Sequence, residues 1–202
     1  MNTVYPPKYH LETDEEKIFH VIERFPLAIL ISSSNDEIQT TQIPLVLDRG
    51  SKTLLGHIDK NNPHGKLLDN RKVSLVFNGP NAYISPTTYA VSELPTWNYI
   101  SVHASGTVTT IHDFDKVSDS IIAMAEFLET EDSNYQLAKG DEKLKALVPY
   151  VTGFEIEIDE MIGRYKLSQD KSAQDTGLAR QHLINANKHD HTALLDYLLD
   201  TQ

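Results

Sequence analysis

The stretch Gly56–Pro63 (G-H-I-D-K-N-N-P) holds the first residues whose types and spacing suit chemistry. A strand is expected to end there in a polar loop with His57 and Lys60, and a helix is expected to begin with Asn62 as its cap. Free backbone N–H groups and the helix dipole at such a start favour an anion. His57 and Lys60 add donors and charge, so the phosphate of a cofactor is the natural ligand. A well-capped helix beside a solvated lysine would give the same pattern.

The stretch Gly163–Gln169 (G-R-Y-K-L-S-Q) is the second group. Arg164, Lys166 and Ser168 alternate along it, so in an extended chain they share one side and form a strip that faces an anion. Such a strip is unusual in a chain with 18 basic and 29 acidic residues. The same cations could instead form salt bridges with the acidic face of the strand expected at 151–158.

The stretch Leu94–Gly106 contains the one tryptophan of the sequence. In a strand its side chains alternate, and one face is aromatic and polar: Trp97, Tyr99, Ser101 and His103. The opposite face is mostly apolar and can enter a core: Asn98, Ile100, Val102 and Ala104. The aromatic and polar face suits a flat ligand or a partner subunit. An ordinary strand with aromatic cross-strand pairs is the alternative.

Composition limits the class of protein to which these residues can belong. The chain has 202 residues, enough for one domain or for a domain with a helical appendage. It has no cysteine, which excludes disulfide and thiolate chemistry and suits a cytoplasmic location. The formal net charge is -11 and no basic run is present, which disfavours direct DNA binding. The first residues do not resemble a signal peptide, and no apolar run approaches the roughly 20 residues that span a bilayer.

Nine histidines raise the question of a metal or haem site. His57 and His103 fall in or beside expected strands, and either could ligate a metal or a haem iron. No histidine pair has the spacing of a helical zinc site and thiolate ligands are absent, so no metal site is predicted.

The elements that position these residues follow from the apolar patterns. A helix is expected at 13–25, with Thr13 as N-cap and Glu16 completing a capping box, and another at 113–130, capped by Asp113. Further helices are expected at 62–70 and, as a weaker pattern, at 137–147. From Asp175 the chain is expected to form two helical pieces, the second at 193–199. Strands are expected at 27–33, 39–47, 54–58, 73–77, 82–85, 151–158 and 161–169, and another begins at Trp97, with 106–111 either continuing that strand or returning from it. Turns are expected at Asn35-Asp36 and Gly79-Pro80-Asn81. Strands joined by short turns favour an antiparallel barrel or sheet with peripheral helices.

Five motifs, taken together and in order, resemble one family. They are Y-x-P near the start, G-H-I-D-K-N-N-P, F-N-G-P-N-A-Y-I-S-P-x-x-Y, L-P-T-W-N-Y-I-S-V-H-A-S-G and Y-K-L-S-Q. Their order and spacing, from about Tyr5 to about Leu183, resemble the PaiB family of FMN-binding split-barrel proteins, which are described as negative transcriptional regulators of sporulation and protease synthesis. The resemblance implies an α+β, mainly β fold, a split β-barrel of the pyridoxamine-oxidase kind with peripheral helices. The FMN-binding split-barrel domain would span 1–170 and a helical C-terminal tail 171–202.

The resemblance also implies a homodimer with FMN at the subunit interface and its phosphate in a basic loop between a strand and the next helix. Trp97 and Tyr99 would lie near the flavin or the dimer seam. The predicted cofactor-binding residues are His57, Lys60, Asn61, Asn62, Lys66, Trp97, Tyr99, Lys166, Ser168 and Gln169. The sequence departs from the family at two positions, where Lys60 often is Arg and Asp170 often is Asn.

These observations lead to one principal hypothesis and three alternatives. The principal one is a dimeric, cytoplasmic FMN-binding sensor or negative regulator whose partners are flavin and itself, with no membrane and no direct DNA contact. The first alternative is a flavin-dependent oxidoreductase, in which the flavin does the redox chemistry. The second is a haem-binding split barrel that uses His57 or His103, and the third is a dimer without cofactor that kept the scaffold.

Overall fold

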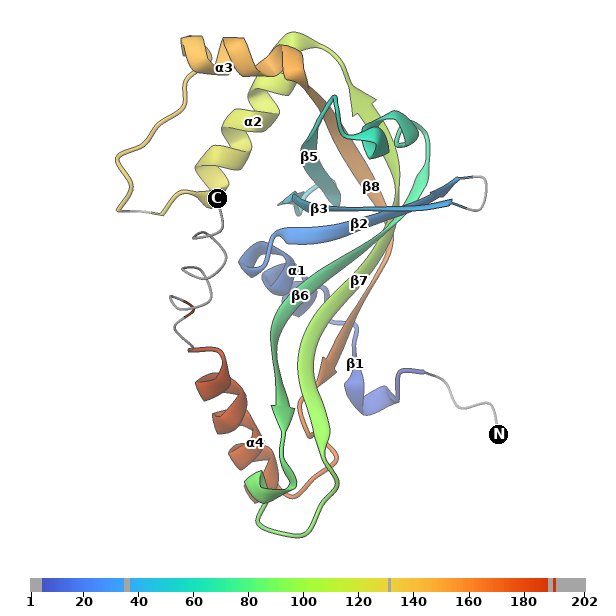
Figure 1. The fold of residues 1–202 in the computed structure, drawn as a ribbon, viewed down its shortest axis with the longest axis vertical. Coiled ribbons are helices and arrows are strands. Elements are labelled where there is room, and N and C mark those ends of the chain that lie inside the picture. Colours follow the sequence, from blue (N-terminus) through green and yellow to red (C-terminus); the bar gives the residue numbers. More distant parts are fainter. Residues whose placement is uncertain (1–4, 35–36, 131, 189–190, 192–202) are drawn as a thin grey trace, which may run out of the picture. The chain divides into compact units, whose positions relative to one another are not determined.

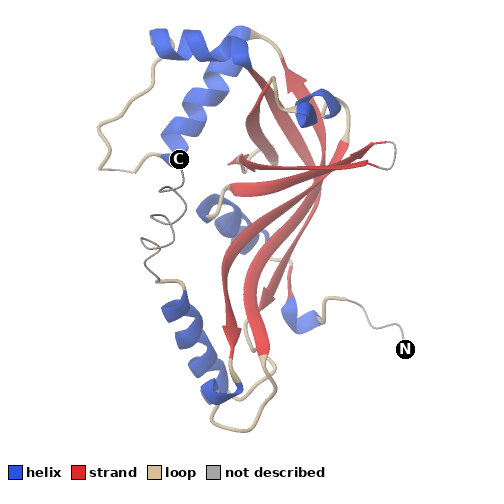
Figure 2. Cartoon of the chain, viewed as in Figure 1, coloured by secondary structure: helices blue, strands red, loops and turns tan. Residues whose placement is uncertain are grey.

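The computed structural model describes residues 5–34, 37–130, 132–188 and 191. Within these ranges an eight-stranded sheet has the order β3-β2-β6-β7-β8-β5-β4, and β1 pairs with β8 (Figures 1 and 2). The strands are β1 (Leu11–Glu12), β2 (Leu27–Ser34), β3 (Glu37–Pro44), β4 (Val46–Asp48), β5 (Thr53–Asp59), β6 (Lys72–Ile84), β7 (Thr96–Ile111) and β8 (Val151–Lys166). The α-helices are α1 (Glu15–Arg24), α2 (Phe114–Leu128), α3 (Glu142–Leu147) and α4 (Ala173–Ala186), and the 3-10 helices are η1 (Lys8–His10), η2 (Pro63–Leu67), η3 (Pro86–Thr88) and η4 (Val148–Tyr150).

The sheet is antiparallel at the pairs β2–β3, β2–β6, β4–β5 and β5–β8, as the short connections predict. Strand β3 lies at one end of the strand order, which explains how it accommodates Pro44 at its last position. The turn predicted at Asn35-Asp36 falls outside the described residues. None of the described helices is long and apolar enough to cross a membrane.

Internal contacts divide the chain into two compact units. The terminal unit consists of the described residues of Met1–Leu11, Gly79–Ile100 and Arg164–Gln202. The central unit consists of the described residues of Glu12–Asn78 and Ser101–Gly163. Strands β6, β7 and β8 contribute residues to both units. The predicted boundary between a barrel domain and a tail at residue 170 stays a prediction.

The central unit has helices packed on the sheet. Helix α1 contacts β4 and buries Ile18, Phe19, Val21 and Ile22, whereas Phe25 at its C-terminus is only half-buried. Helix α2 contacts β5. A second cluster joins α2 to α3, η4 and the start of β8 through Val117, Ile121, Leu144, Val148 and Val151. Burial of these side chains supplies most of the driving force that holds the helices in place.

The terminal unit has its own core, in which α4 packs against the ends of β6 and the following loop (Figure 1). The buried residues are Ala82, Ile84, Tyr89, Ala179 and Leu183. Helix α4 begins at Ala173 because Ser172 caps it, two residues before the predicted start. The second tail helix predicted at 193–199 lies outside the described residues.

The sequence prediction divides two long strands that the structure keeps continuous. Strand β6 passes through the predicted turn at Gly79-Pro80-Asn81, and β8 runs unbroken over 151–166. Strand β7 spans 96–111, so the segment 106–111, which is expected either to continue the Trp97 strand or to return from it, continues it. A tight turn at this triplet would favour a positive φ, and no glycine in the described ranges has one. Gly79 instead permits close approach, because a Cβ there would lie 3.3 Å from Ile100.

Several helix boundaries also differ from the sequence prediction. Asp14, not Thr13, caps α1, and its side chain accepts hydrogen bonds from the N–H groups of Glu16 and Lys17. The weak helix predicted at 137–147 shortens to α3, because Asp141 caps it immediately after Gly140. The cap that Asp113 forms on α2 is confirmed, and the helix ends at Leu128.

Candidate functional site

The segment 57–66 comprises the end of β5, the loop that follows it and most of η2, all in the central unit. Asn62 caps η2 as predicted, and its Oδ1 accepts a hydrogen bond from the N–H of His64 at 3.0 Å. The helix is a 3-10 helix that ends at Leu67, not an α-helix that reaches Asn70, so it lacks an extended macrodipole. The groups that this segment offers to an anion are therefore its side chains and turn N–H groups, without the dipole of an α-helix.

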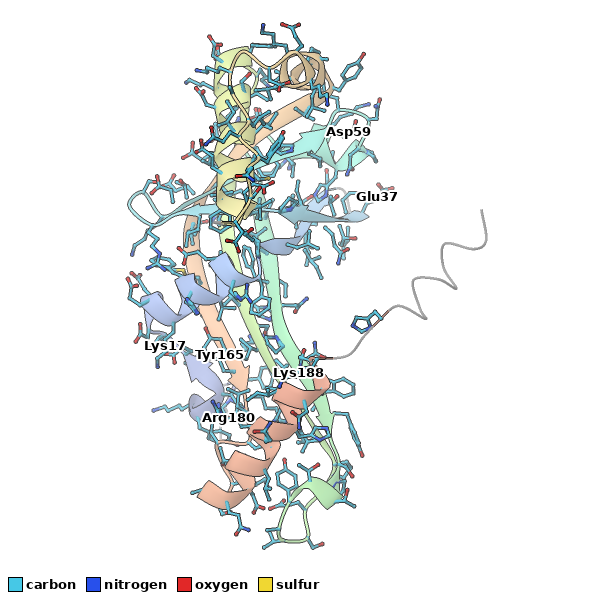
Figure 3. The ribbon with its side chains drawn as sticks, turned by 90° about the vertical axis from the view of Figure 1, so that its left-hand side faces the viewer. Lys17, Glu37, Asp59, Tyr165, Arg180 and Lys188 are labelled. Atoms are coloured by element: carbon cyan, nitrogen blue, oxygen red, sulfur yellow. The ribbon has the colours of Figure 1, made fainter. Side chains whose placement is uncertain are left out.

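The cations of this segment differ in their surroundings. Lys60 is exposed, and its Nζ donates to the carbonyl oxygen of Pro149 at 2.6 Å, while its backbone N–H donates to Tyr150. An ammonium group has three donors, so two protons of Lys60 are still able to reach a ligand. Lys66 and Asn61 are also exposed, and the Asn61 N–H donates to Oδ1 of Asp59 at 2.7 Å. Asp59 is labelled in Figure 3.

His57 has one ring nitrogen without a partner. The side chain is half-buried in β5, and no described residue is within hydrogen-bonding distance of its buried Nδ1. Burial lowers the pKa of His57 below its usual value of 6.5, which favours the neutral ring. A neutral imidazole can donate or accept one hydrogen bond at that position.

Sequence analysis missed His64, which anchors the segment. Its side chain is 1 % exposed, and its Nε2 and Nδ1 pair with the hydroxyl oxygens of Ser32 and Thr41 at 2.8 and 2.9 Å. Burial lowers the pKa of His64. No local signal could have found it, because its partners lie 32 and 23 positions away in the chain. The histidine ties η2 to the β2–β3 hairpin and so fixes the backbone from which Lys66 projects.

Ser168 is the corresponding anchor in the terminal unit. Its backbone has a φ of 61°, and its buried Oγ hydrogen bonds with the hydroxyl of Tyr89 at 2.9 Å and with the Asn98 amide at 3.0 Å. The chain turns here, so the predicted extended run to Gln169 ends at Lys166. The side-chain amide of Gln169 is bonded to the backbone of its own turn, at Leu167 and Tyr165.

The predicted cationic strip is only partly formed. Lys166 donates to Thr96 Oγ1, and the Arg164 guanidinium lies over the ring of Tyr5, 5.9 Å from its centroid. The alternative interpretation was a salt bridge to the acidic face of β8. Among the described ion pairs, the one made by that face joins Asp159 to Lys72 at 3.4 Å.

Two cavities border the turn at 166–169. One of about 330 Å³ has a polar lining that includes Lys166, Ser168 and Lys171, although Lys171 is already paired with Glu93 at 2.8 Å. The other, of about 460 Å³, is mostly apolar and contacts Leu167 and Gln169 of the same turn. Alternate residues of the turn thus line different cavities, and both volumes lie in the range of ligand pockets.

The β7 stretch also lies partly in the terminal unit and matches the predicted alternation at most positions. Asn98 is 1 % exposed, and Trp97 is 51 % exposed with its Nε1 donating to Asn81 Oδ1 at 3.1 Å. The Tyr83 ring lies 6.1 Å from that of Trp97. Burial raises the pKa of Tyr99, and a hydrogen bond with Tyr5 adds to the shift. Ser101 departs from this alternation, because it belongs to the predicted aromatic and polar face and yet is buried.

The ten predicted cofactor-binding residues fall into two groups of five. The central unit holds His57, Lys60, Asn61, Asn62 and Lys66, which occupy one short segment. The terminal unit holds Trp97, Tyr99, Lys166, Ser168 and Gln169. Each group is assembled by its own unit, and its role in cofactor binding stays a prediction.

The first group has the chemistry that an FMN phosphate requires. It combines two exposed ammonium groups with amide donors, and within the segment one carboxylate, Asp59, accompanies them. The unpartnered Nδ1 of His57 is buried and is not exposed with these groups. The residues present therefore fit the phosphate end of the cofactor.

Comparison with solved structures identifies the fold. The chain is similar to the FAD and heme binding protein from Mycobacterium smegmatis, with a TM-score of 0.64 and 14 % identity over 84 % of this chain and 80 % of that one. It is similarly related to the flavocytochrome Anf3 from Azotobacter vinelandii, with a TM-score of 0.65 and 15 % identity over 86 % and 78 % of the two chains. The predicted split-barrel fold with peripheral helices is confirmed.

Sequence comparisons give the family. The chain is 27 % identical over 177 residues to the protease synthase and sporulation protein PAI 2 of Bacillus subtilis, with 85 % of each chain covered. It is 26 % identical to an uncharacterized protein of Emericella nidulans, over 85 % of this chain and 87 % of that one. The family model described as "Putative FMN-binding domain" matches residues 4–160. The predicted PaiB resemblance is therefore confirmed, and the chain belongs to this FMN-binding domain family.

Proposed function

We propose that this protein binds FMN as a homodimer and acts as a flavin-binding sensor or negative regulator. The observation that carries the proposal is the segment 57–66, which lies inside the family match at 4–160 and exposes Lys60, Asn61 and Lys66 around a turn fixed from within. A phosphate is best held by several charge-assisted donors on a rigid backbone. When bound, FMN supplies redox chemistry that the side chains lack.

In this proposal the phosphate contacts the central unit through Lys60, Lys66 and the amides of Asn61 and Asn62, while His57 lies half-buried near the end of β5. Trp97 and Tyr99 supply aromatic surface to the isoalloxazine ring or to the second subunit. Lys166, Ser168 and Gln169 fall beyond the family match, which ends at 160, so they are the weaker part of the predicted set. The boundary at residue 170, with 171–202 as an appended helical tail, belongs to the same proposal.

The regulatory role rests on the name of the Bacillus relative, which refers to protease synthesis and sporulation. A net charge of -11 is unfavourable for a phosphate backbone, so we infer that regulation proceeds through a small molecule or another protein in the cytoplasm. A half-exposed tryptophan beside a tyrosine suits a subunit interface, because aromatic residues are enriched there.

The first experiment is a titration of the purified protein with FMN, followed by quenching of flavin fluorescence and by absorbance. Lys66→Ala should weaken binding by about 1–2 kcal/mol, and Lys60→Ala by a similar amount, since each removes a charge-assisted contact to the phosphate. Lys143→Ala, an exposed lysine of α3, is the matched control and should leave the Kd unchanged. Riboflavin, which lacks the phosphate, should bind wild type and Lys66→Ala equally.

Protein that does not quench FMN at any concentration tested would refute the proposal. Light scattering of the same preparation tests the homodimer. Consumption of NAD(P)H above the free-flavin rate would favour the oxidoreductase alternative. A Soret band on addition of haem, lost in His57→Ala or His103→Ala, would favour the haem alternative.

A further inference from the structure

We propose that the apolar cavity between α4 and β6–β7 is a second binding site, for a small apolar monocarboxylate. The cavity has a volume of about 460 Å³ and lies wholly within the terminal unit. The proposal goes beyond FMN binding, because it concerns none of the phosphate-binding segment 57–66 and would hold in a protein that bound no flavin.

The walls of the cavity are hydrocarbon. One side is formed by Pro80 of β6 and Ile100 of β7. The other side is formed by Leu183 and Ile184 of α4. Leu167, which follows β8 and precedes α4 in the sequence, also lines the cavity. Ile184 is 36 % exposed, so apolar surface stands open at the mouth instead of closing into the core. Exposed concave apolar surface of this size is the usual character of a ligand pocket.

The polar groups that line the cavity are already hydrogen bonded within the protein. The Asn98 amide pairs with Ser168, and Thr176 Oγ1 donates to the carbonyl oxygen of Ser168 at 2.9 Å. The Asn187 amide donates to the carbonyl oxygens of Leu183 and Asn81. The Gln169 amide is also used, by the backbone of its own turn. These groups have little capacity left for a polyhydroxylated ligand such as the ribityl chain of a flavin.

Arg180 is the exception. Its side chain lines the cavity and is exposed on α4, where Figure 3 labels it, and it makes none of the side-chain hydrogen bonds or ion pairs found in the described ranges. An arginine presents paired N–H donors that match a carboxylate. Among the described residues that line the cavity, Arg180 alone carries a charge. One cation above a hydrocarbon cavity selects a ligand with one anionic group and an apolar body.

The test is isothermal titration of the full-length protein with octanoate and, as the uncharged probe of the same length, 1-octanol. Octanoate should bind about ten-fold more tightly than 1-octanol, because the charge-assisted contact is present only for the acid. Arg180→Gln should remove that difference and leave the affinity for 1-octanol unchanged. Arg71→Gln, which alters an exposed arginine of the other unit, is the matched control and should bind octanoate as the wild type does.

A second variant tests the walls. Ile100→Asp places a charge in the cavity and should abolish the binding of both probes, while its thermal unfolding shows whether it remains folded. The proposal is overturned if neither probe binds the wild type, or if Arg180→Gln binds octanoate with wild-type affinity. The titration with octanoate is repeated in the presence of saturating FMN to separate the two sites. If FMN fully prevents octanoate binding, the cavity belongs to the flavin and a second site is refuted. Octanoate binding in a preparation that fails to bind FMN would support this site alone.

Discussion

Two polar turns of this protein are each built on one buried side chain, yet they offer a ligand opposite surroundings. His64 holds the turn at 57–66, and the lysines and amides of that turn stand exposed around it. Ser168 holds the turn at 166–169, whose residues line two cavities in alternation. The first turn presents charge at a surface, and the second presents enclosed volume.

The difference indicates how recognition is divided. Charge at a surface suits a phosphate, whose affinity comes from several cationic donors and not from burial. Enclosed apolar volume suits hydrocarbon, whose affinity grows with the surface removed from water. The terminal unit would be a poor phosphate site, because Lys171 is neutralised by Glu93 and Lys166 already donates to Thr96. Breaking each anchor separately should therefore damage different properties.

Removal of the histidine anchor should have the largest effect. His64→Ala eliminates two buried hydrogen bonds and leaves a cavity beside Ser32, so the free energy of unfolding should fall by about 3 kcal/mol. Urea denaturation measures the loss. His20→Ala, an exposed histidine of α1, is the control and should change stability by less than about 0.5 kcal/mol.

The same variant sharpens the comparison if it stays folded. FMN affinity should decrease, since the turn that carries Lys66 loses its fixed backbone, while octanoate affinity should be unchanged. A loss of octanoate binding with intact FMN binding would reverse the assignment of the two turns.

Removal of the serine anchor should cost less. Ser168→Ala leaves the Tyr89 hydroxyl and the Asn98 amide without their buried partner, which should lower the free energy of unfolding by about 2 kcal/mol. Ser92→Ala, at an exposed position of the same unit, is the control. The expected effects on ligand binding are the opposite of those for His64→Ala. Ser168→Ala should weaken octanoate binding and should leave FMN phosphate binding unchanged. Equal losses in both titrations would show that the two turns do not act independently.

Much of the fold was predictable because it depends on neighbours in sequence. Alternating burial along β7 and the caps at Asn62 and Asp113 each follow from a pattern within a few residues. The boundaries failed where a distant contact overrides a local signal. The Gly79-Pro80-Asn81 triplet resembles a turn, but the chain stays extended there and Gly79 makes room for Ile100.

The candidate site shows the same limit more strongly. The exposed cations were predictable, because a lysine in a polar loop is expected to lie at the surface. The buried anchors were not, because His64 becomes important only through Ser32 and Thr41 on another part of the sheet. Ser168 belongs to the predicted anion-facing strip, and its hydroxyl is held by Tyr89, 79 positions earlier in the chain, a contact that no local pattern indicates.

The pH dependence of stability tests the environment of the first turn. Burial lowers the pKa of His57 below its usual 6.5, so below that pH the unfolded chain binds a proton that the folded chain does not. The contribution of the neutral ring is fully present above pH 6.5 and is lost as the pH falls through the lowered pKa. For one proton the slope is at most about 1.4 kcal/mol per pH unit. His57→Gln should flatten the curve between about pH 7 and about pH 5 relative to His20→Gln. If the curve of His57→Gln runs parallel to that of the wild type, the His57 side chain is not desolvated in the folded protein. That result would argue against a buried His57 ring with an unpartnered nitrogen.

The smallest effect is expected at Trp97, which belongs to neither anchor. Its side chain is 51 % exposed, so Trp97→Ala should lower the free energy of unfolding by only about 1 kcal/mol, against the roughly 3–5 kcal/mol typical of a buried tryptophan. Trp97→Phe, which keeps an aromatic ring beside Tyr83, should be nearly neutral. Urea denaturation at two protein concentrations makes the measurement informative. A loss of about 1 kcal/mol that does not depend on protein concentration fits an exposed ring. A much larger loss that depends on concentration would place Trp97 in a subunit interface. The second subunit would then be part of the binding surface of the terminal unit.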